Sequence, residues 1–528
     1  MLRSSPARMA ASTPVTTPRT AAWRFCLALA GALGLGATVP SPAFAQDRLL
    51  SVVAPWQVTS LDPADTGYIA ARMGIAETIV GVEPDGRLVG LVAAGWSLDD
   101  DRLTWRFPVR AGLRFHDGTP VTPADLMAAV ERARATGETL GAVPIASMAV
   151  AGDTLVLKTS APFAPLPAFL TDYAAIVLAP SARGADGKIA AWTGTGPYRV
   201  TAIDGDRSVD VMAFERGGAL PAVRRARYHA VPQGETRAAM VEAGDADVAY
   251  TLLPAAVPRI NAGSRAKVQS VTIPRVRVMP LNVGLPVFAD VRVRQAISLG
   301  LDRAGIAAAV LRHPPSAATQ LLPPILAEWH NPALPPYARD IARARALLAE
   351  AGWTPGEGGV LHKDGTALRF TVLVLANRPE LPPMAAAMQA QLREIGIDMQ
   401  IRTGPGSIVP QAHRDGTFQA GLVSRTYVNV PDPIGTILPD FTRDRTVWAQ
   451  SGWINAEIRA LVPEYTASFD EGRRAALRKR IGEILHAELP VIPVAWFEHT
   501  VAVSSRLKPV PVDPYEQRYL IDRMAWAN

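Results

Sequence analysis

The chain contains almost no cysteine. Among its 528 residues there is one, Cys26, and it lies in an apolar stretch near the N-terminus. The rest of the chain therefore has no thiol for nucleophilic catalysis, no disulfide and no thiolate ligand for a metal. A chain of this length does not need disulfides, because it can bury a large core.

Catalytic and metal-binding motifs are also missing. There is no G-x-S-x-G elbow, no phosphate loop ending in Gly-Lys-Ser and no H-E-x-x-H motif. The eight histidines are scattered, and no two are four residues apart. We therefore predict a protein that is not an enzyme and has no metal site and no cofactor. His116, beside Asp117, is expected to make a structural hydrogen bond rather than to take part in catalysis.

The first 45 residues have the order of charges and apolar residues that is typical of a secretory signal peptide. An uncharged apolar run, FCLALAGALGLGATV, is followed by small residues at Ala43 and Ala45 that frame a cut before Gln46. We predict cleavage there and a periplasmic protein. An uncleaved membrane anchor is the alternative, but about 15 apolar residues are short for a span of ~20. Four arginines and no acid precede the apolar run: Arg3, Arg8, Arg19 and Arg24.

Without this segment the charge is nearly balanced. Removing residues 1–45 takes away four positive charges and no negative ones, so the net charge falls from +6 to +2. A net charge of +2 is too small to predict binding to the phosphate backbone of a nucleic acid. Basic clusters such as residues 224–227 are interpreted as solvated faces, and no nucleic-acid partner is expected.

Residues 103–133 have the clearest local pattern. The run LTWRFPVR alternates apolar and polar residues, which predicts a half-buried strand. A turn follows at HDGTP, where Gly118 tolerates a left-handed backbone. Thr122 is expected to cap a helix, with Pro123 in the first position and Asp125 in the first turn. Helical and strand patterns alternate through the rest of the chain, which indicates an α/β architecture.

Several further segments, taken in order, make the chain similar to one family. It resembles the extracytoplasmic solute-binding proteins of family 5, the peptide-binding and nickel-binding subunits of ABC importers. Besides residues 103–133, the resemblance is carried by SLDP (60–63), AETIV (76–80), GTGPYRV (194–200), the helix-like DVRVRQAISLGLDRAGI (290–306), ARDIARARALLAEAGW (338–353) and LHAELPVIPVAW (485–496).

The resemblance implies a type II periplasmic-binding-protein fold of the α/β class. Such a fold has two α/β lobes with a ligand cleft between them, and here an extra inserted domain is expected. The expected parts are the signal peptide (1–45), a discontinuous lobe I (46–80, 196–284 and 486–528), the extra domain (81–195) and lobe II (285–485).

The resemblance also implies what the protein does. The lobes would close around a peptide-like or anionic small molecule, and the closed form would be presented to an inner-membrane ABC permease with its ATPase. We expect a monomer that leaves its solute unaltered. The alternative is a secreted hydrolase or a ligand sensor that reuses the fold.

The dipeptide-binding branch of the family suggests ligand residues. There, an Arg holds the ligand carboxylate and a later Asp holds its ammonium group. Arg378, in LVLANRPELPP, stands where that Arg belongs, and Asn429, in SRTYVNVPDP, stands in place of the Asp. An amide cannot neutralise an ammonium group, so free-amine dipeptides are disfavoured. The alternatives are a shifted register with Asp432 in this role, or Glu380 as the source of negative charge.

Further residues are candidates for the pocket wall. Arg378 follows the apolar strand FTVLVLA, and ligands in α/β sheets gather at the carboxyl ends of strands; a solvated Arg is the alternative. Arg425 is a second candidate cation. Tyr68, expected in the loop after Leu-Asp-Pro, and Tyr427 are candidate lining residues. Four tryptophans are expected in the core or at lobe edges: Trp192, Trp448, Trp453 and Trp496.

Overall fold

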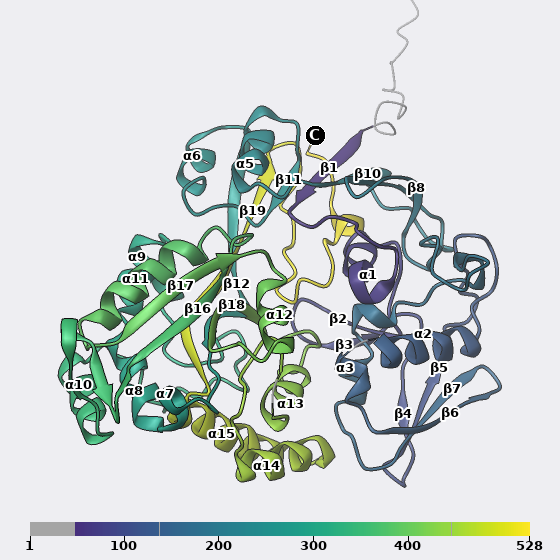
Figure 1. Cartoon of the computed structure of the whole chain (residues 1–528). Coiled ribbons are helices and arrows are strands. Elements are labelled where there is room, and N and C mark those ends of the chain that lie inside the picture. The colour runs from purple at the N-terminus through teal and green to yellow at the C-terminus, as the bar shows by residue number, and fades with distance from the viewer. Residues whose placement is uncertain (1–47, 137, 445, 528) are drawn as a thin grey trace, which may run out of the picture. The chain divides into compact units, whose positions relative to one another are not determined.

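The computed structural model describes residues 48–136, 138–444 and 446–527. The predicted signal peptide and Cys26 lie outside the described residues. Within them, a mixed ten-stranded sheet has the order β17-β16-β18-β12-β19-β11-β1-β10-β9-β8 (Figure 1). Its strands are β1 (Leu49–Ala54), β8 (Tyr198–Asp204), β9 (Ser208–Ala213), β10 (Arg225–Ala230), β11 (Val248–Tyr250), β12 (Ala266–Pro280), β16 (Arg369–Leu375), β17 (Asp398–Gly404), β18 (Ala420–Thr426) and β19 (Val491–Ser504).

Strands β12 and β19 join two halves of this sheet. They have 15 and 14 residues, and they pair antiparallel from Ala266 opposite Ser504 to Pro280 opposite Val491. On one side of them lie strands from residues 369–426. On the other lie strands from the N-terminal half of the chain. The chain therefore crosses between its two α/β lobes along β12 and β19.

Helices cover the strands of each half. Helix α11 packs against β16, β17 and β18, and α5 packs against β11 and β19. No helix in the described residues is long and apolar enough to cross a membrane. The helices of these halves are α1 (Pro63–Arg72), α5 (Gly234–Ala243), α6 (Val257–Ala262), α7 (Pro286–Ala289), α8 (Val291–Gly300), α9 (Arg303–Ala309), α10 (Ile341–Glu350), α11 (Leu381–Arg393), α12 (Ile408–Arg414), α13 (Ile434–Thr442), α14 (Ala456–Ala467) and α15 (Glu471–Glu488).

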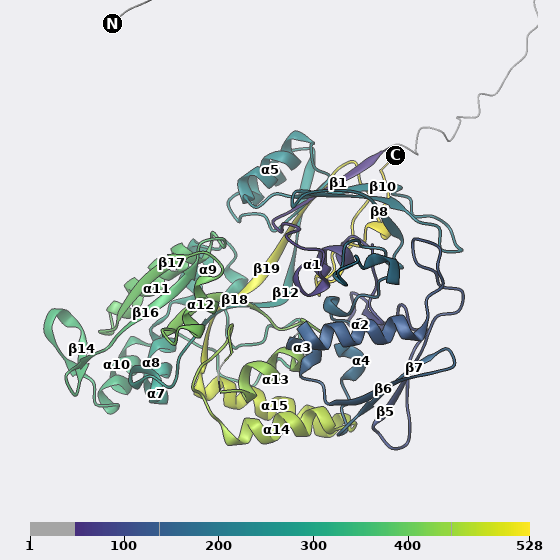
Figure 2. The ribbon, with the colours of Figure 1, turned by 45° about the vertical axis from the view of Figure 1, so that its right-hand side comes forward.

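A separate four-stranded antiparallel sheet, in the order β4-β5-β7-β6, lies inside the stretch predicted as the extra domain. Strand β5 buries Trp105 and Phe107, which confirms the strand predicted from LTWRFPVR. Helix α2 lies between this sheet and α1 (Figure 2). The domain boundaries themselves remain a prediction. The elements here are β2 (Val80–Val82), β3 (Leu88–Gly90), β4 (Ser97–Leu98), β5 (Thr104–Pro108), α2 (Pro123–Thr136), α3 (Glu138–Gly141), β6 (Ile145–Ala151), β7 (Thr154–Thr159) and α4 (Leu166–Phe169). A small sheet elsewhere holds β13 (Thr354–Pro355), β14 (Leu361–Lys363) and β15 (Thr366–Ala367).

The start of α2 contains the residues expected there. Gly118 has a left-handed φ of +86°, as the turn requires, and Pro123 opens the helix. Thr122 donates both its N–H and its hydroxyl to the Asp125 carboxylate, at 2.8 and 2.7 Å. The acid in the first turn therefore reaches back to the residue before the helix, as in a capping box.

Helix α1 begins at the Leu-Asp-Pro motif. Asp62 accepts a hydrogen bond from the N–H of Ala64 at 2.9 Å, and Pro63 takes the first helical position. The expectation that Tyr68 lies in a loop is therefore wrong, because an Asp followed by Pro is a strong helix start. Tyr68 and Arg72 lie four residues apart on this helix, so they share one face.

The segment 290–306 forms two helices, α8 and α9, rather than one. The first ends at Gly300, and Asp302 caps the second, accepting a hydrogen bond from the N–H of Gly305 at 2.8 Å. Arg303 is buried and donates from Nε to the carbonyl of Pro493 at 2.7 Å. The consecutive residues Asp302 and Arg303 therefore connect helices α8 and α9 to strand β19.

The GTGPY motif brings two backbone segments into direct contact. A Cβ on Gly194 would lie 2.4 Å from the carbonyl oxygen of Ile75, and one on Gly196 would lie 2.1 Å from that of Gly74. Only glycine allows such an approach. The contact fixes residues 74–78, of which Gly74, Ala76, Glu77 and Thr78 line the cavity described below.

His116 supports the same contact through a structural hydrogen bond, as expected. Its Nε2 lies 2.9 Å from the carbonyl oxygen of Gly196, and its ring packs edge-on against Phe214. Burial lowers the pKa of His116 to about 4, although the bond to Gly196 opposes this shift. The ring is therefore neutral at pH 7 and donates from Nε2.

Replacing Gly196 should destabilise the protein. Gly196→Ala is expected to lower the free energy of unfolding by about 1–3 kcal/mol, because the added methyl group overpacks the contact with Gly74. Urea denaturation followed by circular dichroism measures this. Gly95→Ala is the matched control, since its Cβ would meet nothing within 4 Å. Equal losses in both variants would show that close approach is not what requires glycine.

Replacing His116 should change how stability depends on pH. His116→Gln is expected to cost about 1 kcal/mol near pH 7 through the lost hydrogen bond. The pKa of His116 is about 4 in the folded protein and 6.5 in the unfolded chain. Between pH 4 and pH 6.5 the unfolded wild type therefore binds more protons than the folded protein. The wild type therefore loses stability as pH falls through this window, and the gap to the variant narrows. Urea titrations at both ends check this; a constant gap would contradict it.

Candidate ligand-binding site

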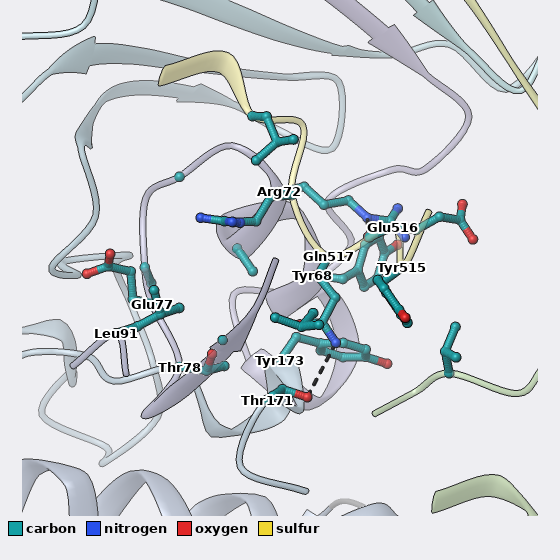
Figure 3. A pocket seen from close by; sticks show the side chains of 18 of the residues that line it. Tyr68, Arg72, Glu77, Thr78, Leu91, Thr171, Tyr173, Tyr515, Glu516 and Gln517 are labelled. Atoms are coloured by element: carbon teal, nitrogen blue, oxygen red, sulfur yellow. Dashed lines mark hydrogen bonds between the residues drawn. The ribbon is translucent and has the colours of Figure 1, made fainter. Parts of the chain in front are cut away.

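A cavity of about 360 Å³ lies where α1, β12 and the C-terminal segment meet, and we call it the central cavity (Figure 3). Its wall is drawn from residues 56 to 522, so it combines parts of the chain that are far apart in the sequence. The lining residues discussed below are Trp56, Tyr68, Arg72, Glu77, Tyr173, Arg216, Arg275, Asn429, Tyr515, Glu516 and Arg518.

Helix α1 presents Arg72 to this cavity. Arg72 is only 9% exposed, and its Nε donates to the carbonyl oxygen of Glu516 at 2.7 Å. Its guanidinium lies over the rings of Trp56 and Tyr68, at 4.4 and 5.1 Å from their centroids. The aromatic faces attract the cation and hold its position. Arg72 is therefore a fixed, buried positive charge on the cavity wall.

Strand β12 contributes Arg275 through an irregularity in its pairing. The register with β19 shifts between Ile273 and Val276, where Pro274 has no N–H to donate. Arg275 donates from Nε to the hydroxyl of Thr426 at 3.0 Å and pairs with Glu516, Nη2 to Oε2, at 2.6 Å. Burial lowers the pKa of Arg275 to about 10, so it stays charged at pH 7.

Glu516 is the counter-charge of this site. Its backbone has a left-handed φ of +54°, a strained conformation for a residue with a side chain. Burial alone would raise the pKa of its carboxyl, but Arg275, followed by His499 and Arg72, lowers the pKa to about 2. Glu516 is therefore ionised and neutralises Arg275.

The remaining lining arginines are paired as well. Arg216 makes two hydrogen bonds of 2.9 Å with the carboxylate of Glu77, and Arg518 lies 3.2 Å from Glu83. Arg72 is different, because no carboxylate among the described residues lies within ion-pair distance of it. Glu516 still acts on Arg72 from a longer distance, because burial alone would lower the pKa of Arg72, whereas Tyr519 and then Glu516 raise it. An anionic ligand would add a direct charge-assisted contact to this arginine.

Aromatic rings form another part of the wall. Tyr68 packs edge-on against Trp56 and Tyr173, with ring centroids 6.1 and 5.6 Å apart. Burial raises the pKa of Tyr68, so its hydroxyl stays neutral. The cavity therefore combines a cation that has no direct ion pair among the described residues with apolar faces and polar tips, which suits a small anion with an apolar or planar part.

The structure brings only some of the predicted residues to this cavity. Tyr68 and Asn429 line it. Arg378 instead lines a neighbouring cavity of about 180 Å³, together with Arg277 and Glu380. Glu380 is 3.4 Å from Arg277 and is thus already paired. The charge of Arg378 still contributes to the low pKa of Glu516, after the larger effects named above.

The other predicted residues lie outside the lining of the central cavity. Arg425 makes two hydrogen bonds with Asp440, at 2.7 and 2.6 Å. Tyr427 is fully buried in the core. Asp432 accepts hydrogen bonds from Tyr465 and Arg474 and lines a different cavity. Either Asn429 or Asp432 could stand where the family's Asp is expected. Only Asn429 lines the central cavity, which favours the alignment that uses Asn429.

Sequence reasoning missed Arg72, Arg275 and Glu516. Arg72 had a usable signal, since it stands four residues after Tyr68 on a well-capped helix. Glu516 lies in a C-terminal run dense in charged and aromatic residues, DPYEQRYLIDR, which was not considered. The tryptophans expected in the core are confirmed as such for Trp192, Trp453 and Trp496, which are buried and do not line the central cavity.

Metal-ligating side chains do not gather in this region. In the part of the chain that the structure describes, no group of three or more His, Cys, Asp or Glu residues is placed to hold a metal ion.

Known proteins of similar sequence and structure are binding proteins. The nickel-binding periplasmic protein of Escherichia coli (strain K12) is 26% identical over 505 residues, which cover 88% of this chain and 94% of that protein. The glutathione-binding protein GsiB of the same strain is 24% identical over 502 residues, covering 90% and 94%. The crystal structure of NikA from Brucella suis in complex with Fe(III)-EDTA superposes with a TM-score of 0.80 at 24% identity, covering 91% of this chain and 100% of that one.

The family itself follows from a match over most of the chain. The sequence model of the bacterial extracellular solute-binding proteins, family 5 (middle), matches residues 87–446. The two-lobe α/β fold and the cavity at the crossing strands agree with that match. The chain belongs to the bacterial extracellular solute-binding proteins of family 5.

Proposed function

We propose that this protein is the periplasmic solute-binding subunit of an ABC importer. It captures a peptide-like or anionic small molecule in the central cavity, leaves it unaltered and delivers it to an inner-membrane permease, and the cavity favours an anion. The predicted signal peptide would direct it to the periplasm, where it would act as a monomer. The family supports the general role, and the cavity wall supports the choice of solute.

The charge of Arg72 is the observation that carries the choice of an anion. Arg275, Arg216 and Arg518 each have a carboxylate within ion-pair distance, whereas no carboxylate among the described residues lies this close to Arg72. A ligand carboxylate at Arg72 would make a charge-assisted hydrogen bond in a site of low dielectric constant. A neutral or cationic solute would give Arg72 no such contact.

The names of the relatives agree with an anionic solute of modest size. Glutathione is a peptide with more carboxylates than ammonium groups, and a metal–EDTA complex is also an anion. A cavity of about 360 Å³ is of the size that binds small molecules. A metal would arrive as a complex with an organic carrier, since the described residues offer no cluster of metal ligands.

Delivery would depend on the two crossing strands. The cavity takes Arg275 from β12 and its aromatic wall from the N-terminal part of the chain. A solute that contacts both β12 and the N-terminal part of the chain would favour the closed arrangement of the lobes over the open one. The permease would recognise that closed form.

A thermal-shift screen tests this function. Purified protein is exposed to dipeptides, N-blocked dipeptides, glutathione, opines, organic acids, sugars and nickel chelates, and a ligand of the folded state raises the melting temperature. Anionic solutes are expected to give the shifts, and sugars are not. Stabilisation by neutral sugars alone would contradict the proposal. Formation of a product from a bound solute would favour a secreted hydrolase instead.

The role of Arg72 can be measured on any anion that binds. Arg72→Ala is expected to cost about 2–5 kcal/mol of binding free energy, since it removes a buried charged contact. Calorimetric titration measures the loss. Arg87→Ala is the control, because Arg87 is exposed and does not line the cavity. Arg378→Ala tests the carboxylate role predicted from the family, and unchanged affinity there would remove Arg378 from the site.

Asn429 is predicted to set the preference against free amines. Asn429→Asp would place a carboxylate in the cavity wall where a ligand ammonium group can meet it. We expect free-amine dipeptides to bind at least about tenfold more tightly to this variant, which is ~1.4 kcal/mol. The matched N-acetylated dipeptides should gain nothing. An equal effect on both series would show that Asn429 does not face the amino end of the ligand.

A further inference from the structure

The central cavity adjoins a second space of about 410 Å³, which we call the outer hollow. Glu77 and Leu91 line both spaces, and in the central cavity they are set apart from Tyr68 and Tyr515 (Figure 3). The junction with the outer hollow therefore lies away from the aromatic rings that hold Arg72. The residues that line both spaces are Glu77, Leu91, Pro197, Arg216 and Asp522.

Asp522 is a carboxylate at this junction that has no ion pair. Three carboxylates line the central cavity, and the other two are Glu77 and Glu516. Glu77 is paired with Arg216 at 2.9 Å, and Glu516 is paired with Arg275 at 2.6 Å. Among the described residues, no basic side chain lies within ion-pair distance of Asp522. Its charge is therefore not met by a direct contact in the wall.

The basic residues near the junction bind other groups. Arg523 follows Asp522 in the chain, and its Nη2 makes hydrogen bonds of 3.0 and 2.8 Å with both carboxylate oxygens of Glu83. Arg518 donates to the same carboxylate at 3.2 Å. Arg110, which lines the outer hollow, donates to two backbone carbonyl oxygens at 2.9 and 2.7 Å. The carboxylate of Asp522 is thus left for a ligand to contact.

A ligand can reach Asp522, and its position relative to Arg72 is fixed. The residue is partly exposed, and neither of its carboxylate oxygens is a buried atom without a partner. The carbonyl oxygen of Glu516 accepts a hydrogen bond from Arg72, and the N–H of Tyr519 donates to the carbonyl oxygen of Arg72 at 2.9 Å. Leu520 has a left-handed φ of +56° and turns the chain into the short helix that carries Asp522. The segment that binds Arg72 therefore also places Asp522.

We propose that Asp522 binds a positively charged group of the solute, while Arg72 binds its carboxylate. The inference rests on the proposed function and narrows the solute to a peptide-like carboxylate with an ammonium or guanidinium group remote from that carboxylate. Each end of the solute would make a charge-assisted contact with a group that has no direct ion pair of its own. This cation is not the α-ammonium group that Asn429 is predicted to disfavour, because Asn429 follows β18 and Asp522 belongs to the C-terminal segment.

Nα-acetyl-lysine and Nα-acetyl-norleucine are matched probes for this contact. Both have a carboxylate and a blocked α-amine, and only the first has a remote ammonium group. Calorimetric titration of the wild type should show about fivefold tighter binding of Nα-acetyl-lysine, as expected for a partly exposed charge pair. Asp522→Asn should bring the ratio of the two affinities to about one. Asp100→Asn should keep the wild-type ratio, because Asp100 is exposed and lines neither space.

Two results would overturn the role of Asp522: equal affinities of the wild type for both probes, or a wild-type ratio in Asp522→Asn. If both probes bind equally and Arg72→Ala weakens both, the anion-binding function stands and only the role of Asp522 is lost. If neither probe binds, a peptide-like carboxylate is not the solute, and the inference fails as well. Thermal unfolding checks that Asp522→Asn is folded. Asp522→Glu keeps the charge and should retain the preference for Nα-acetyl-lysine.

Discussion

The buried ion pair between Arg275 and Glu516 is the interaction on which the site depends. Both side chains are less than a tenth exposed, at 8% and 7%. The pair ties the crossing strand β12 to the C-terminal segment, and the backbone of that segment in turn receives the Nε of Arg72. Removing either partner would leave a buried charge uncompensated, which is far more costly than never having had the pair. The left-handed backbone at Glu516 is tolerated because it places the carboxylate there. One ion pair therefore sets the positions of three elements and leaves Arg72 without a direct ion pair among the described residues.

Much of the fold was predictable because its signals are local. The strand before HDGTP, the Pro123 helix start, the GTGPY turn and the strand near residue 491 each depend on a few neighbouring residues, and each is found as expected. The errors were local too. Tyr68 was placed in a loop because the Asp-Pro helix start was not recognised, and residues 290–306 were treated as one helix because the capping role of Asp302 was overlooked.

The site was less predictable, for a physical reason. Its wall joins residues 56 to 522, and no spacing along the chain indicates that Arg72, Arg275 and Glu516 meet. Pairing also decides which charges are available. The positions of Arg425 and Asp432 in the sequence suggested contacts with the ligand. In the structure, however, Arg425 pairs with Asp440 and Asp432 pairs with Arg474. Tyr68 and Asn429 reach the cavity because the elements that carry them, α1 and the chain after β18, both end at it.

The place of Glu516 in the chain has a consequence for the order of synthesis. Glu516 is synthesised 241 residues after its partner Arg275, and residues 515–522 supply one part of the cavity wall. A nascent chain that has passed Arg275 but not yet reached Glu516 already contains most of the fold's local elements but lacks the carboxylate that balances Arg275. The binding site is therefore incomplete until residues 515–522 have been made. Under the proposed function, a chain that lacks these residues should not bind the solute.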